Sequence, residues 1–155
     1  MATSGRTDGG AMRAMSSGIA VDAEVSAAWA DIRATDAGGQ GAVTWALFEI
    51  VPDASNPKQP VLQLVGKGSC SEEFWKTYDA KELKGKVVWG GVRAKSSGKF
   101  YGLMCVGDDV GGMAKGKASM HKNGVMNLLE GKSGEVAGND IDEFREKLTE
   151  IVGEF

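Results

Sequence analysis

The sequence predicts one domain of the α/β type, in its α+β form, with a central mixed β-sheet of five to six strands flanked by helices on both faces. Its 155 residues are the length of one ordinary domain. Hydrophobic residues make up 42% and charged residues 25%, which is typical of a globular protein with a buried core. Helix-like segments lie between pairs of strand-like segments rather than after every strand, and this order favours a mixed sheet.

The first 15 residues are small and polar, and we expect them to form a flexible N-terminal extension to a domain that spans 16–155. Arg13 lies close to Ser16 and Ser17, a context that a kinase could recognise. The simpler interpretation of these serines is a solvated tail.

The first predicted helix covers residues 22–34. Val25, Trp29 and Ile32 recur there at helical spacing, so they form one apolar stripe. Asp22 is suited to be the N-cap of this helix, because a short acidic side chain accepts a hydrogen bond from the first free N–H groups.

Residues 43–51 carry the strongest strand signal. Apolar residues occupy both alternating faces of this run, which indicates a central strand covered on both sides. All three prolines follow in the loop 52–60. The short run 61–65 is then expected to pair with the first strand as a hairpin.

Two helices are predicted from their capping residues. Ser69 and Glu72 have the spacing of a capping box, so a short helix should continue through Tyr78. The last helix should begin near Asn139 or Asp140, both good N-caps. Its apolar stripe consists of Ile141, Phe144, Leu148, Ile151, Val152 and Phe155.

A second hairpin occupies the middle of the chain. Its first strand begins at Val87, its turn is residues 95–98, and its second strand is residues 100–106. A long helix over 113–129 and a very short strand at 135–137 follow. We expect this long helix to carry the function, because it combines lysines with a half-apolar face.

Composition excludes several classes of function. The net charge of −3 argues against general nucleic-acid binding, which needs a broad basic surface. Cys70, Cys105 and His121 are too few and too scattered for a zinc site, so we expect no metal and no cofactor. Cys105 reads as a small core residue. No apolar run reaches the roughly 20 residues of a membrane span, and we expect a cytoplasmic protein.

The run 111–118 fits the phosphate-loop pattern GxxxxGK, which makes a nucleotide-binding enzyme one alternative. Ala118 stands where the pattern needs a hydroxyl for magnesium, and Ser119 lies about 100° further round the helix. The preceding strand belongs to a hairpin, and Asp108 and Asp109 would repel a triphosphate. His121 has no nucleophile at a recognisable spacing, so the sequence offers no case for an enzyme.

At about 100° per residue, the long helix has two different sides. Ala114, Ala118, Val125 and Leu129 share one sector and should pack on the sheet. Facing away from the sheet are Met113 and Met120, flanked by Lys115 and Lys122 on one side and by Lys117 on the other. Methionine is common at protein-binding surfaces, so this side is either a docking surface or a loosely packed, solvated helix face.

From Ser16 to Phe155, the chain resembles the actin-depolymerising-factor homology domain of the ADF/cofilin and coactosin superfamily. The run KFYGLMCVGDDVGGMAKGKASMHK, from Lys99 to Lys122, resembles coactosin in particular. The run VTWALFEI resembles the first strand of the family, and SSGIAV after Met15 resembles the amino terminus of ADF/cofilin.

The resemblance implies an actin-binding protein of the cytoskeleton whose long helix inserts into a cleft between actin subdomains. Lys115 and Lys117 match the basic pair of that helix. Met113 and Met120 would supply apolar contact, and Lys122 would add charge. The expected protein is a monomer that binds filaments, and monomeric actin as well, with acidic phospholipid contact through its basic surface.

Further residues are assigned by the same resemblance. Lys99 matches a coactosin lysine implicated in filament binding, and Arg93 and Lys95 lie in a hairpin that would reach a second actin subunit. Ser17 matches the phosphorylatable serine of ADF/cofilin if Met15 is taken as the start of the domain, and Ser16 is its neighbour. Coactosin-like binding that regulates filament dynamics is the favoured function. Severing and depolymerisation of the ADF/cofilin type is the alternative, and an interaction domain for another partner is a further one.

Overall fold

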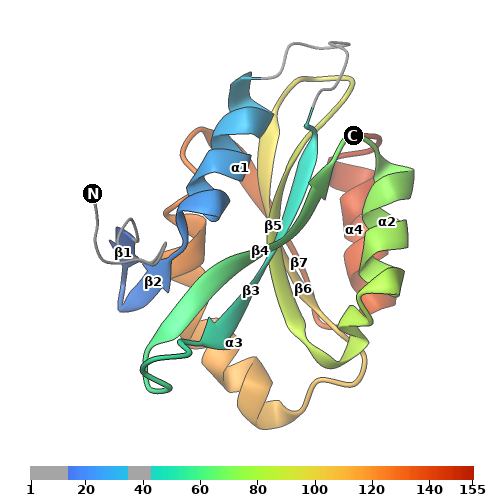
Figure 1. Ribbon diagram of the computed structural model, residues 1–155. Coiled ribbons are helices and arrows are strands. Elements are labelled where there is room, and N and C mark those ends of the chain that lie inside the picture. The colour runs from blue at the N-terminus through green and yellow to red at the C-terminus, as the bar shows by residue number, and fades with distance from the viewer. Residues whose placement is uncertain (1–13, 35–42) are drawn as a thin grey trace.

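The computed structural model describes residues 14–34 and 43–155 (Figure 1). The strands of the described part form one mixed seven-stranded sheet in the order β1-β2-β4-β3-β5-β6-β7. Strands are β1 (Ala14–Ser16), β2 (Ile19–Val21), β3 (Trp45–Pro52), β4 (Pro60–Gly68), β5 (Val87–Arg93), β6 (Phe100–Val106) and β7 (Lys132–Gly138). Helices are α1 (Ala23–Ala34), α2 (Ser71–Ala80), α3 (Gly112–Met126) and α4 (Ile141–Ile151), with a 3₁₀ turn at Leu83–Gly85.

The predicted fold class is confirmed, but five to six strands was too few. The two additional strands are β1 and β2, which form an antiparallel hairpin. Ser17 and Gly18 make its two-residue turn, and both have positive φ, 49° and 83°. Strands of three residues are too short to show a periodic pattern, so neither strand was predicted. Apart from Ala14 and Met15, the predicted extension lies outside the described residues.

The pairing of the strands confirms both predicted hairpins. β3 pairs antiparallel with β4 on one side and with β5 on the other, so it is the central strand, as expected. β5 and β6 form the second hairpin. β6 also pairs in parallel with β7, which makes α3 the crossover of a β6–α3–β7 unit. The objection that this strand belongs only to a hairpin was therefore wrong.

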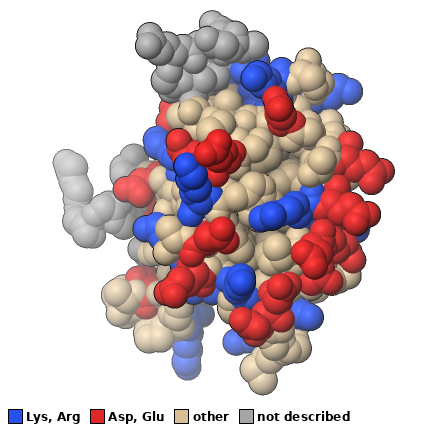
Figure 2. All heavy atoms as spheres, turned by 90° about the vertical axis from the view of Figure 1, so that its right-hand side faces the viewer, with Lys and Arg blue, Asp and Glu red and all other residues tan. Residues whose placement is uncertain are grey.

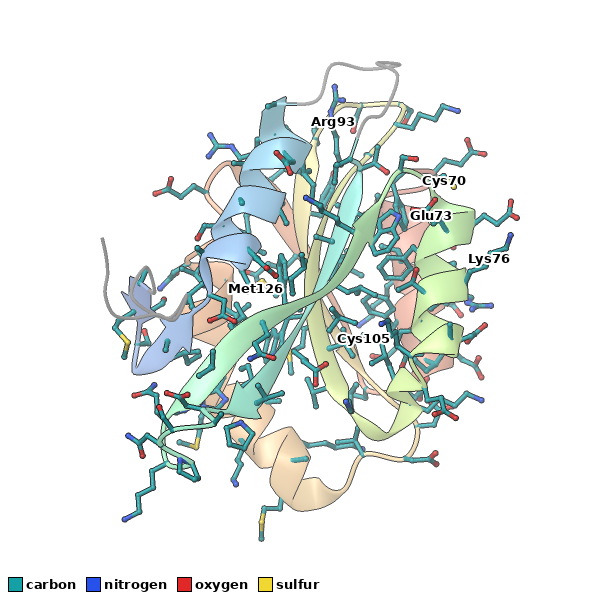
Figure 3. The ribbon with its side chains drawn as sticks, in the orientation of Figure 1. Cys70, Glu73, Lys76, Arg93, Cys105 and Met126 are labelled. Carbon is teal, nitrogen blue, oxygen red and sulfur yellow. The ribbon has the colours of Figure 1, made fainter. Side chains whose placement is uncertain are left out.

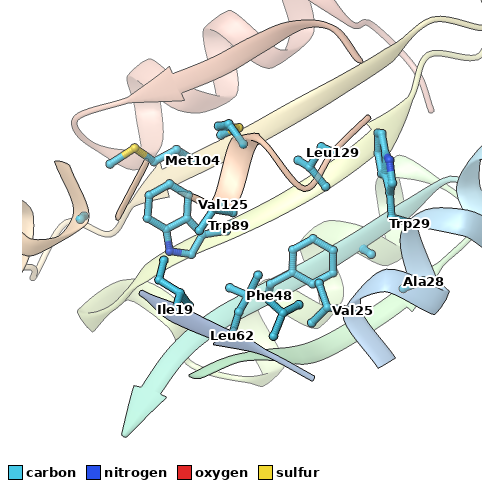
Figure 4. Close-up of a cluster of buried hydrophobic side chains, with 14 of the residues drawn as sticks. Ile19, Val25, Ala28, Trp29, Phe48, Leu62, Trp89, Met104, Val125 and Leu129 are labelled. Carbon is cyan, nitrogen blue, oxygen red and sulfur yellow. The ribbon is translucent and has the colours of Figure 1, made fainter. Parts of the chain in front are cut away.

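Helices cover the sheet on both faces, with α1 and α3 on one side and α2 and α4 on the other (Figure 1). Alternate residues of β3 serve the two cores: Phe48 lies in the α1/α3 core and Trp45 in the α2/α4 core. Figure 4 shows the α1/α3 core, in which Trp89 of β5 and Val125 of α3 are both buried. Each face of the sheet thus packs against one pair of helices through its own apolar core.

The helix ends correct one prediction and confirm another. Ser69 and Glu72 form no capping box, because the N-cap of α2 is Cys70 and makes no side-chain cap bond. Instead, the Ser71 hydroxyl accepts the Phe155 N–H at 3.0 Å and ties α2 to the C-terminus. Asp140 does cap α4, accepting the Glu143 N–H at 2.8 Å. Within the described residues, every helix is too short or too polar to cross a bilayer.

Candidate interaction surface

The loop from β6 to α3 is hydrogen-bonded to the backbone of the 3₁₀ turn and of the residue that follows it. The Gly107 N–H donates to the Lys86 carbonyl at 3.1 Å, and the Asp109 N–H donates to the Lys84 carbonyl at 3.0 Å. A Cβ on Gly107 would overlap the Lys84 carbonyl, so only glycine fits there. The Asp108 carboxylate accepts the Ile141 N–H at 3.0 Å, so it stabilises the start of α4.

The first half of α3 stands clear of the sheet. Residues 112–117 are all exposed, and Ala118 is the first buried residue of the helix. Ala114 was predicted to pack on the sheet and is exposed, which corrects the predicted apolar face at its N-terminal end. Packing is concentrated further along the helix and just after it, where Val125 and Leu129 are buried as predicted.

Two methionines of α3 are exposed, one in its first half and one just beyond the buried Ala118. Met113 is 80% exposed and Met120 is 78% exposed. Lys115 and Lys117 are exposed beside them, and neither has a carboxylate partner in the part of the chain that the structure describes. We call these four residues the α3 surface. It combines adaptable apolar side chains with uncompensated positive charge.

Lys122 differs from the other two lysines of the helix. Its Nζ lies 3.7 Å from Oε1 of Glu135 on β7, and its side chain is 40% exposed. The pair holds Lys122 against the sheet, so this lysine is less available to a partner than Lys115 and Lys117.

The β1–β2 hairpin packs against the second half of α3. The Ser16 hydroxyl donates to the Gly124 carbonyl at 2.6 Å. An added Cβ on Gly124 would lie 3.1 Å from the Ser16 carbonyl oxygen, so this glycine allows the hairpin to approach closely. Met15 in the hairpin is 61% exposed. Met15 was not predicted as an exposed apolar residue, because it lies in a run of small polar residues that has no periodic pattern.

Arg93, Lys95 and Lys99 form a second, separate group, the hairpin tip. They lie at or next to the turn between β5 and β6, at the opposite end of the sheet from the start of α3 (Figures 1 and 3). β6 alone separates the two ends by roughly 20 Å. Lys95 is tied to the C-terminal segment, since its N–H donates to the Glu154 carbonyl at 2.8 Å. Lys99 has no ion-pair partner within residues 14–34 and 43–155.

Charge is distributed unevenly over the two faces. α3 contains three lysines and no Asp or Glu. On the opposite face, α2 has three acidic residues and one lysine, and α4 has four acidic residues and two basic ones. Figure 2 shows the face of α2 and α4, where acidic side chains gather. An acidic partner is therefore favoured at α3 and disfavoured at α2 and α4.

The side chains of α3 and of the strand before it do not form a phosphate loop or an activated nucleophile. Ala118 is buried, and the Ser119 hydroxyl donates to the Lys115 carbonyl at 3.2 Å. Burial raises the pKa of the Cys105 thiol to about 12, so this cysteine stays protonated at neutral pH. Burial, and to a lesser degree the charge of Lys117, lowers the pKa of His121. No cluster of three metal-binding side chains occurs among the described residues.

No protein-family model and no curated protein matches this sequence. Solved structures do match its fold. Cofilin from Streptomyces griseoflavus superposes with a TM-score of 0.64 at 12% identity, covering 86% of this chain and 96% of that one. Coactosin from Entamoeba histolytica gives a TM-score of 0.61 at 18% identity, covering 82% and 88%. Mouse coactosin, described as an actin filament binding protein, gives 0.53 at 19% identity, covering 84% and 90%. The chain has the ADF/cofilin fold that its sequence resemblance implied.

Proposed function

We propose that this protein binds actin, on filaments and as monomers, through the α3 surface, and that it acts without catalysis. The observation that carries the proposal is the exposure of Met113 and Met120 beside two unpaired lysines on a helix whose first half leaves the sheet. Such side chains contribute nothing to the core of this domain, whereas methionine adapts well to a partner surface. The fold likeness to mouse coactosin, an actin filament binding protein, points to actin as that partner.

Co-sedimentation with filamentous actin tests the proposal directly, together with a binding measurement on monomeric actin. We expect saturable binding of the intact chain. The double variant Lys115→Ala/Lys117→Ala should bind about tenfold more weakly, because each lysine contributes about 0.5 to 1 kcal/mol through a contact at the edge of an interface. Its circular dichroism and thermal unfolding should be unchanged, since both side chains are exposed.

The matched control is Lys76→Ala/Lys147→Ala, two lysines on the opposite face of the molecule. This control should bind as the parent chain does. Absence of both pelleting and monomer binding would reject actin as the partner. An equal loss in the two double variants would move the site away from α3.

We further propose that the protein coats filaments rather than severing them, and that it works as a cytoplasmic monomer on the cytoskeleton. A binding domain severs only if it prefers a twisted filament to the resting one, because differential affinity is what shifts the filament. The coactosin-like run from Lys99 to Lys122 supports coating. A timed measurement of filament length should show unchanged lengths; rapid shortening would favour the ADF/cofilin alternative. The same lysines are available to acidic phospholipids.

A further inference from the structure

A cavity of about 370 Å³ lies between the first half of α3 and strands β3 and β5. Its apolar wall is formed by Ile50, Val87 and Trp89 of the sheet and by Ala114 and Ala118 of the helix. This volume is at the lower end of the range of about 300 to 1,000 Å³ in which small-molecule sites fall. The cavity is open to solvent on one side and is large enough for a small ligand.

The sequence explains why the cavity exists. Ala114 and Ala118 are four residues apart and share one face of α3, so the helix contributes only two methyl groups to the apolar wall. Ile50 and Val87 across from them are only partly buried. Larger residues at the two alanine positions would close the gap, as Val125 does further along the helix, where it is fully buried.

The polar lining carries one net positive charge. Lys86 Nζ lies 3.2 Å from Glu49 Oε1, so these two charges compensate each other. Lys117 also lines the cavity and has no acidic partner in the described part of the chain. His121 lines it as well, and burial and Lys117 lower its pKa, so the ring is neutral at pH 7. A ligand that matches this lining has an apolar body and a single negative charge.

We propose that this cavity binds a free amphipathic monoanion, a medium-chain fatty carboxylate, with its chain against Val87, Trp89 and Ala118 and its carboxylate at Lys117. A neutral ligand would leave Lys117 uncompensated, and a cation would meet it with like charge. The apolar wall buries the chain, which is the main source of affinity, and the lysine selects the head group. Lys117 belongs to both the α3 surface and this cavity, but binding of the carboxylate does not require actin.

The test is a calorimetric titration of the full chain, without actin, with decanoate kept below the concentration at which it forms micelles. We expect saturable binding of one decanoate per chain, with decanol and decylamine at least tenfold weaker. Lys117→Gln should weaken decanoate binding about fivefold. The matched control is Lys115→Gln, an exposed lysine two residues away that does not line the cavity, and it should leave the affinity unchanged.

A second variant, Ala118→Leu, places a larger side chain in the cavity and should abolish binding while the chain stays folded by circular dichroism. If that variant does not fold, the comparison of Lys117→Gln with Lys115→Gln still tests the proposal. Absence of saturable binding, equal affinity for decanol, or an equal loss in Lys115→Gln would overturn the proposal. So would binding of the chain only to phosphatidylglycerol vesicles and not to free decanoate, which would assign the lysines to a membrane surface.

Discussion

Individual side chains determine which part of α3 is tied to the rest of the molecule. Ser16 bonds to Gly124, and Lys122 pairs with Glu135. Just beyond the helix, the Trp29 indole N–H donates to the Glu130 carbonyl at 3.0 Å. These contacts all fall at or after Lys122, so they anchor the end of the helix and leave the α3 surface, which precedes Lys122, free of them.

The contact of Ser16 with α3 gives a prediction for stability. Ser16→Ala should lower the free energy of unfolding by about 1 kcal/mol, because the carbonyl of the buried residue Gly124 would lose its hydroxyl donor. Urea unfolding followed by circular dichroism measures this change. Ser17→Ala is the control: Ser17 is exposed, and its replacement should change stability by less than about 0.5 kcal/mol. Equal effects of the two substitutions would contradict the role given to Ser16.

The same contact bears on modification of the two serines. The Ser16 hydroxyl is already engaged, whereas Ser17 is exposed at the turn. We therefore expect Ser17 to be the better substrate for a kinase. A phosphate there would add about two negative charges beside α3 and should weaken binding to an acidic partner.

His121 is the single histidine of the chain, so its titration can be followed without ambiguity. We expect NMR to show a pKa below the ordinary value of 6.5, because burial and Lys117 both disfavour the charged ring. The unfolded chain then binds the proton more readily, so the stability contributed by His121 is present above about pH 6.5 and is lost as pH falls below it.

The variant Lys117→Gln provides the matching measurement. Removing the positive charge should raise the pKa of His121 toward 6.5, whereas Lys115→Gln should move it less, because Lys117 is the charge identified as lowering it. A His121 pKa above 6.5 in the parent chain, or no response to Lys117→Gln, would show that the ring lies in a different environment.

Two elements carry the candidate residues, and they lie at opposite ends of the sheet. The α3 surface follows the end of β6, whereas the hairpin tip precedes its start. One actin subunit that contacts α3 would have to extend over roughly 20 Å to reach Lys99 as well. We propose that the two groups contact two different actin subunits, an arrangement that a filament offers and a monomer does not.

This separation predicts a selective effect of the hairpin tip. Lys99→Ala should weaken filament binding about fivefold and leave monomer binding unchanged, because the monomer would contact only α3. Filament pelleting and a monomer binding titration measure the two affinities. Lys58→Ala, which removes an exposed lysine from the loop between β3 and β4, is the control and should change neither. An equal loss of filament and monomer binding in Lys99→Ala would contradict the two-subunit arrangement.

At the scale of the whole molecule, charge rather than shape distinguishes the two faces. Both faces of the sheet are covered by a pair of helices, yet α3 is basic while α2 and α4 are predominantly acidic. The net charge of −3 conceals this difference. An acidic partner would be attracted to α3 and repelled by α2 and α4, so the charge pattern orients the encounter.

Electrostatic attraction of this kind is sensitive to salt. Filament affinity should fall as the salt concentration rises from about 0.05 to about 0.3 M, because exposed charges are screened over shorter distances. The variant Lys115→Ala/Lys117→Ala should show a shallower dependence, since it lacks the charges that salt screens. Pelleting assays across this range provide the measurement. An affinity that does not change with salt would mean that the methionines alone carry the contact.

Much of the fold followed from local patterns, and much of the site did not. The two-sided apolar run of β3 and the helical stripe of α4 predicted elements that the structure contains. The β1–β2 hairpin was missed because strands of three residues have no measurable period. Ala114 was misplaced because helical spacing identifies a face of α3 but not how far along the helix the sheet extends.

By itself, the sequence determined the order of the elements from α1 to α4, the central position of β3 and the outward side of α3, because each depends on periodicity within one segment. Only the tertiary structure decided that β6 pairs with β7, that Asp108 binds the start of α4, and that the hairpin tip lies far from the α3 surface. It also decided that the first half of α3 stands over a cavity. These features depend on contacts between residues distant in the chain, and no local pattern of apolar and polar residues specifies them.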